Sequence, residues 1–89
     1  MNAAELRAVV EANEVTITQY ELQLQSLREL SDGNKQDIEA LRRGDDLRQI
    51  LIALSERRQV HFDRDIRSVE EVLKTMRANQ KMLMESTKG

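Results

Sequence analysis

The sequence predicts an all-α protein, in which long amphipathic helices pair as an antiparallel coiled coil. The first observation is composition: the 89 residues include no proline, no cysteine, no tryptophan and only three glycines, and 34% of them are charged. A core this small, with only one tyrosine, one phenylalanine and no disulfide, needs helices packed on one another for stability. The second observation is a heptad repeat along the whole chain. The third is a match between the two halves in reverse order.

The heptad repeat starts with Ala3 at position a and Leu6 at position d, and it continues to Leu83 without an insertion. Such 3-4 spacing over many heptads indicates a coiled coil. The a and d positions form a seam, which we predict to be the packing or dimer interface. Its residues are Val10, Asn13, Ile17, Tyr20, Leu24, Leu27, Asn34, Ile38, Leu41, Asp45, Arg48, Ile52, Gln59, Phe62, Ile66, Val69, Leu73, Met76, Gln80 and Leu83.

We expect one module over residues 1–89, with a first helical half at 3–43, a hinge or turn at 44–46 and a second helical half at 47–85. Gly44 suits the end of a helix, and the aspartates after it suit the cap of a new one. A second cluster of turn formers, at 31–34, also invites a break. The alternative at both places is a continuous helix that tolerates its glycine at about 1 kcal/mol.

Polar residues on the seam predict the register, because a buried polar group is costly unless another polar group meets it. A parallel dimer would bring Asp45 against Asp45 and Arg48 against Arg48, and both layers would repel. An antiparallel pair with Asp45 against Arg48 gives every layer residue numbers that sum to 93. The resulting layers are Asn34 with Gln59, Asn13 with Gln80, Val10 with Leu83, Ile17 with Met76, Tyr20 with Leu73, Leu24 with Val69, Leu27 with Ile66, and Leu41 with Ile52. Two weaker layers mix Ser31 with Phe62 and Ile38 with Ser55.

The flanks of the seam agree with this register. The e positions of the two halves bring opposite charges together, as with Arg42 and Glu56, or Arg77 and either Glu14 or Glu21. Each exposed pair contributes well under about 1 kcal/mol, so these charges select an orientation more than they stabilise it.

The same layers form in two ways, and the sequence leaves both open. Two straight chains can cross as a homodimer, which is the arrangement we prefer, or one chain can fold back as a hairpin that turns at Gly44–Asp46. The homodimer is the domain-swapped form of the hairpin, because each chain receives from its partner the helix that the hairpin supplies itself. A straight helix would be about 130 Å long at 1.5 Å per residue.

The middle of the chain is apolar nearly all round. Leu47, Ile50, Leu51 and Leu54 lie off the seam beside Ile52. Since a helix that is apolar on all sides is normally buried, we expect this patch to meet further helices, from a partner or from a second unit. The alternative is a seam that simply broadens at a hinge.

No motif for catalysis, a cofactor or a metal stands out, and we expect no enzyme activity. Arg43–Gly44–Asp45 is the tripeptide that integrins recognise, but three residues recur by chance. His61 has no second imidazole or thiol to form a metal site with. Adjacent acids such as Glu70 and Glu71 point to different helix faces and cannot act as one acid/base pair. Arginines gather in the middle, at positions 42, 43, 48, 57, 58, 64 and 67, among aspartates and glutamates that dilute their field.

We therefore expect a structural oligomerisation module of a cytoskeletal, centriolar or kinetochore scaffold. Its expected partner is a second copy of the same chain. One alternative is a small adaptor, chaperone or regulator that binds another helical protein through the apolar middle. A second is binding of a filament, a microtubule or nucleic acid by the central arginines, which the net charge of −2 disfavours. We expect no small-molecule substrate and no membrane partner. We expect an intracellular location, either cytoplasmic or cytoskeletal.

Overall fold

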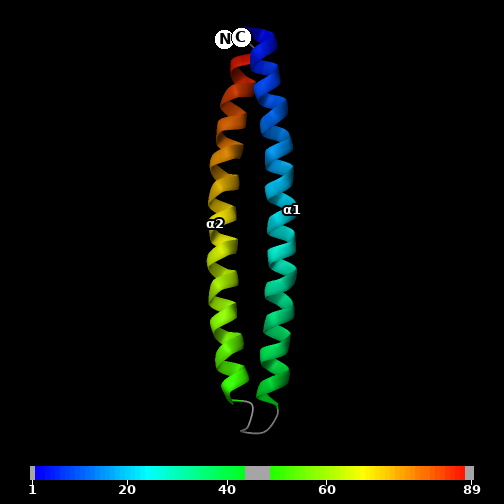
Figure 1. Ribbon diagram of the computed structural model, residues 1–89. Coiled ribbons are helices and arrows are strands. Elements are labelled where there is room, and N and C mark those ends of the chain that lie inside the picture. Colours follow the sequence, from blue (N-terminus) through cyan, green and yellow to red (C-terminus); the bar gives the residue numbers. More distant parts are fainter. Residues whose placement is uncertain (1, 44–48, 88–89) are drawn as a thin grey trace.

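A computed structural model of the chain shows two long α-helices that fold against each other as a hairpin (Figure 1). The structure describes residues 2–43 and 49–87. Helix α1 is Ala3–Arg42 and helix α2 is Gln49–Thr87. The helices lie side by side over their whole length, and the hairpin measures 66 × 14 × 14 Å. The all-helical fold class is therefore confirmed, in an elongated two-helix form.

The straight helix that we preferred from the sequence is not what the structure shows. Helix α2 instead runs back along α1, as in the hairpin alternative. Both arrangements make the same layers outside the turn, but the hairpin makes them within one chain and avoids the entropy cost of association. The expected turn at 44–46, the first residues of the second half and the layer of Asp45 with Arg48 lie outside the described residues.

Helix α1 begins with an N-cap, Asn2, that the heptad pattern does not reveal. The Asn2 side-chain oxygen accepts a hydrogen bond from the Glu5 backbone N–H at 2.8 Å, and the Asn2 amide donates to the Glu5 carboxylate at 3.1 Å. The first bond satisfies a backbone N–H that the helix start leaves without a partner, and the second joins the two side chains. The sequence signal is the Asn-x-x-Glu spacing directly before the first apolar residues.

The cluster of turn formers at 31–34 does not interrupt α1, which stays helical through all of it. Ser31 and Asn34 face α2 and are buried, whereas Gly33 points to open space on the other side. The alternative of a continuous helix therefore holds here, because the polar groups of this segment find partners across the interface rather than in a turn.

The core lies between the two helices and centres on Leu24, Val69 and Leu73. Ile17, Tyr20, Leu27 and Ile66 pack around these three side chains. The same residues form the adjoining layers Tyr20–Leu73, Leu24–Val69 and Leu27–Ile66 of the register derived above. Leu73 is the most enclosed of them, with 1% of its surface exposed.

Burial follows the heptad frame closely in the described part of the chain. Apart from Val9 and Thr16, every described residue that is buried or half-buried occupies an a or d position. Val9 and Thr16 both occupy g positions near the start of α1, so the interface widens toward that side of the hairpin. Neither described helix contains a stretch long and apolar enough to cross a membrane.

Candidate interaction surfaces

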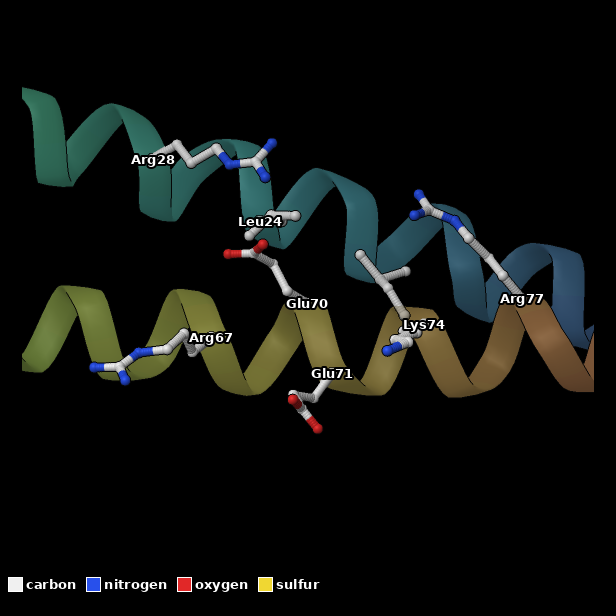
Figure 2. Close-up of a pocket in the computed structure, with 8 residues that line it drawn as sticks. Leu24, Arg28, Arg67, Glu70, Glu71, Lys74 and Arg77 are labelled. Carbon is white, nitrogen blue, oxygen red and sulfur yellow. The ribbon is translucent and has the colours of Figure 1, made fainter.

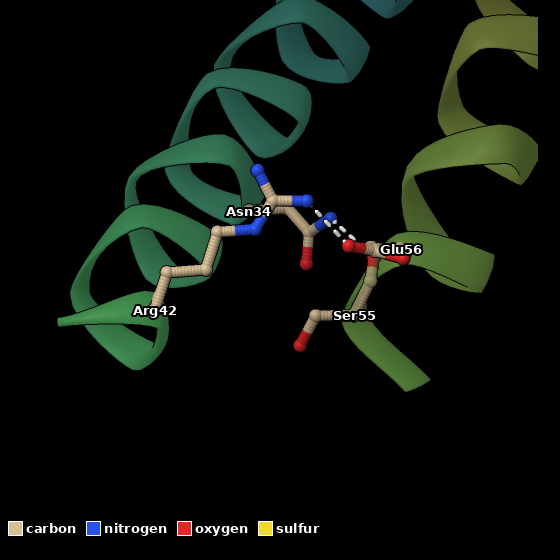
Figure 3. A network of polar contacts seen from close by, with 4 residues as sticks. All are labelled: Asn34, Arg42, Ser55 and Glu56. Atoms are coloured by element: carbon tan, nitrogen blue, oxygen red, sulfur yellow. Dashed lines mark hydrogen bonds and ion pairs between the residues drawn. The ribbon is translucent and has the colours of Figure 1, made fainter. Parts of the chain in front are cut away.

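A polar cluster interrupts the apolar interface near the turn end of the hairpin. The Asn34 amide donates to the Ser55 backbone carbonyl at 2.8 Å and to the Gln59 side-chain oxygen at 3.0 Å. The Gln59 amide in turn donates to the Ser31 hydroxyl oxygen at 2.7 Å. Figure 3 shows Asn34 reaching between the helices toward Ser55. Because Asn34, Ser31 and Ser55 are all buried, these bonds tie one particular alignment of α1 to α2.

A second polar contact lies near the open end of the hairpin. The buried Gln80 amide donates to the Val10 backbone carbonyl at 2.9 Å. The sequence register places Gln80 against Asn13, and the structure instead directs its amide to the backbone one turn earlier. The Gln80 and Asn34 side-chain oxygens are buried and accept no hydrogen bond within the described residues.

Ser31 and Ser55 both belong to the polar cluster of Asn34 and Gln59. The Ser31 hydroxyl accepts a hydrogen bond from Gln59 on α2, and the Ser55 backbone carbonyl accepts one from Asn34 on α1. Two layers that look mismatched in sequence are thus part of the same polar cluster. The reason is the reach of Asn34 and Gln59, whose amides bridge to residues one turn away from the layer in which they meet.

One edge of the hairpin is strongly charged. At the e positions every described residue from Arg7 to Arg77 carries a charge except Gln49. Arg42 forms an ion pair with Glu56 (Figure 3), and Arg77 forms one with Glu21 at 3.4 Å. Both pairs are among those that the register predicts. We call the e and b positions together the charged edge.

A groove of about 520 Å³ runs along the charged edge (Figure 2). Arg28, Glu70, Lys74 and Arg77 line it, with Leu24 at its floor. Figure 2 shows Glu70 pointing toward α1 and its neighbour Glu71 pointing away, as expected for adjacent residues on a helix. Acids and bases alternate along the groove, so it offers no concentrated field of either sign to a charged ligand.

The opposite edge carries few charges. It carries the c and g positions of both helices, and we call it the low-charge flank. Among its described residues, only Glu5, Asp37, Arg58 and Asp65 bear a full charge. The other described members are Val9, Ala12, Thr16, Gln19, Gln23, Ser26, Leu30, Gly33 and Ala40 on α1, and Leu51, Leu54, His61, Ser68, Val72, Thr75, Asn79, Met82 and Ser86 on α2.

The apolar middle of the sequence lies at the turn end of the hairpin. Ile50, Leu51 and Leu54 are 74%, 52% and 50% exposed, and Ile52 is half-buried on the seam. Leu47 lies outside the described residues. Three large apolar side chains thus face solvent within little more than one helical turn, which is uncommon unless a further surface covers them.

The remaining candidates do not gather into one site. Arg58 lies on the low-charge flank, Arg67 on the charged edge, and Arg57 and Arg64 at f positions between them. The central arginines therefore face several directions rather than forming one basic stripe. His61 is exposed on the low-charge flank.

The tripeptide Arg43–Gly44–Asp45 falls largely outside the described residues, as does Arg48. Over residues 2–43 and 49–87, no group of histidine, aspartate or glutamate side chains is placed to hold a metal ion. No protein-family model, curated protein or solved structure matches this chain.

Proposed function

We propose that this chain is a structural, non-enzymatic oligomerisation module, an antiparallel coiled coil that dimerises or spaces a larger scaffold of cytoskeletal, centriolar or kinetochore type. The observation that carries the proposal is the agreement between burial and one heptad frame along both helices. A frame without insertions over about 40 residues per helix is typical of rods whose role is to hold distances and to pair.

The polar cluster supports pairing as the role of the interface. Asn34 and Gln59 occupy positions that apolar residues would make more stable, and their hydrogen bonds specify alignment instead. In coiled coils such a polar layer selects partner orientation at a cost in stability. The partner helix is supplied within the hairpin, or by a second chain when two copies open and exchange their helices.

The experiment that tests the proposal measures solution mass by light scattering and maximum dimension by small-angle X-ray scattering over a range of concentrations. A dimeric mass supports the oligomerisation module. A maximum dimension of about 130 Å would identify the exchanged rod of straight helices, and one of about 70 Å would identify paired hairpins. A mass that stays monomeric at all concentrations contradicts the proposal.

The exposed apolar turn end favours a second candidate, a small adaptor that binds a helix of another protein through Ile50, Leu51 and Leu54. An amphipathic partner helix buries its apolar face in such a patch. This candidate predicts a monomer that binds a hydrophobic dye. Replacement of Leu51 and Leu54 by glutamine should lower dye binding at unchanged helix content, whereas replacement of the equally exposed Leu22 should not. Equal dye binding by all variants would exclude the turn end as the binding surface.

A further inference from the structure

The two edges of the hairpin differ in a way that intrachain packing does not require. The ion pairs of Arg42 with Glu56 and of Glu21 with Arg77 lie on the charged edge. Charged side chains of this kind are well solvated, so this edge is stable when exposed to water. On the low-charge flank, the side chains are small, uncharged or apolar over most of the length, and Leu30, Leu51, Leu54 and Met82 are each at least half exposed. A flank of this kind resembles a helix face that another helix covers.

We infer that the low-charge flank binds a second copy of this hairpin, with both turn ends at the same end, to form a four-helix bundle. The inference rests on the proposed oligomerisation function and assigns it an interface. On a helix with 3.6 residues per turn, the centre of the c and g positions lies about 110° from the centre of the a and d positions. This is close to the right angle between the two neighbours of each helix in a four-helix bundle.

Side-chain size fits a two-fold axis that runs along the hairpin. Such an axis lays α2 of one copy on α1 of the other, with residues of equal height opposite each other. In the register set by the Asn34–Gln59 bond, Leu54 is level with Ala40, and Met82 is level with Ala12. Each large apolar side chain of these pairs therefore meets a small one, as close packing between helices requires.

One pair of flank charges fits the same axis. Asp37 and Arg58 are level with each other on the flank, and neither forms an ion pair with the described residues of its own chain. In the bundle, Asp37 of each copy faces Arg58 of the other, so the interface contains two complementary pairs. Inverting one copy would instead lay α1 on α1 and α2 on α2, and Asp37 would no longer meet Arg58.

The area is sufficient for a second copy. A flank that runs the full 66 Å of a hairpin 14 Å across has a projected area of about 900 Å², against about 800 Å² per partner in a stable protein–protein interface. A single partner helix would cover only part of this flank. A second hairpin covers both of its helices, together with Leu51 and Leu54 at the turn end.

The first test compares two variants that introduce the same charge on opposite edges of α2. Val72→Glu places a carboxylate on the low-charge flank, and Val60→Glu, the matched control, places it on the charged edge. We expect Val72→Glu to raise the dimer dissociation constant at least about tenfold by desolvating an unpaired charge, and Val60→Glu to leave it unchanged. Circular dichroism checks that both variants keep the helix content of the wild type.

The second test exchanges charges between two chains. Arg58→Glu alone and Asp37→Lys alone each turn both interface pairs into like-charge pairs, so each variant should dimerise more weakly than the wild type. An equal mixture of the two variants restores both pairs. In the mixed dimer, the introduced glutamate of one chain faces the introduced lysine of the other, and the native Asp37 faces the native Arg58. We expect the mixture to form a heterodimer about 70 Å long.

The outcomes separate this inference from the proposed function. A wild-type chain that stays monomeric overturns both. A dimer about 130 Å long supports the oligomerisation module and overturns the flank interface. A dimer about 70 Å long that responds equally to Val72→Glu and Val60→Glu, or a charge-exchanged mixture that does not associate, also overturns the flank interface while the oligomerisation module stands.

Discussion

Two stretches of the same interface contribute differently to the stability and to the register of the helix pair. Around Leu24, Val69 and Leu73, the helices bury aliphatic side chains that supply stability but little alignment, because a slide by one heptad again brings aliphatic residues together. Around Asn34 and Gln59, buried amides supply alignment but little net stability, since their hydrogen bonds replace equivalent bonds to water. The stability and the register of this helix pair therefore depend on separate layers and can be altered separately.

The largest effect should come from the aliphatic stretch. Leu73→Ala removes the most enclosed side chain and should lower the free energy of unfolding by about 2–4 kcal/mol. Urea denaturation followed by circular dichroism measures it. Leu22→Ala is the matched control, because Leu22 is 59% exposed and its loss should cost much less. Equal losses would show that the aliphatic stretch is not where stability resides.

The polar stretch should respond differently to one change than to two. Asn34→Ala leaves the Gln59 side-chain oxygen without its donor and should cost about 1–3 kcal/mol. Replacing both Asn34 and Gln59 by leucine should recover that loss or more in the same urea titration. The recovered stability should come with a less well-defined register of α1 against α2. If α2 shifts by one heptad along α1, the leucine introduced at position 34 can pack on Ile66.

Spin labels at the exposed positions 22 and 71 report this alignment, because the register places the two positions at the same height on opposite helices. We expect one narrow distance distribution in the otherwise unchanged chain and a broader one in the double-leucine variant. A distribution that stays narrow would mean that the aliphatic layers alone set the register.

A smaller effect tests the helix that carries the polar stretch without touching its hydrogen bonds. The side chain added by Gly33→Ala would meet nothing within 4 Å, so the substitution should raise stability by about 0.5–1 kcal/mol through helix propensity. Thermal unfolding at low protein concentration measures the gain. Ala40→Gly, also exposed on α1, should lower stability by a similar amount. A loss on Gly33→Ala would show that this segment needs the freedom of glycine.

The smallest effect belongs to the charged edge. A double-mutant cycle of Arg42→Gln and Glu56→Gln should give a coupling of about 0.2–0.5 kcal/mol that weakens with added salt, because both side chains are largely exposed. A coupling of several kcal/mol would mean that the edge, and not the polar stretch, determines the alignment. The chemically similar cycle of Arg67→Gln and Glu56→Gln, whose members form no ion pair with each other, should give none.

Much of this fold could be predicted from the sequence, because burial on a helix pair follows a period that residues such as Leu24, Val69 and Leu73 display directly. The layer of Asn34 with Gln59 was also predictable, since two polar residues on an apolar seam lower each other's cost by meeting. The choice between rod and hairpin was not, because both make the same layers and differ only around residues 44–46.

Finer polar geometry was also beyond the sequence. The long side chain of Gln80 can reach either the Val10 backbone carbonyl or the Asn13 side chain. Residue spacing does not show which of these two acceptors it bonds. Of the candidate surfaces, the exposed turn end follows from the apolar run at 50–54. The low-charge flank also follows from the antiparallel register, which brings the e positions of both helices to one edge and their g positions to the other.

The first turn of α1 and the last turn of α2 lie together at one end of the hairpin (Figure 1). A hairpin whose two ends lie together can be inserted into a surface loop of a carrier protein without forcing the two ends of that loop apart. The far tip, with Ile50 and Leu54, would then stand about 60 Å clear of the carrier. A label or an affinity handle at either end would accordingly leave that tip unobstructed.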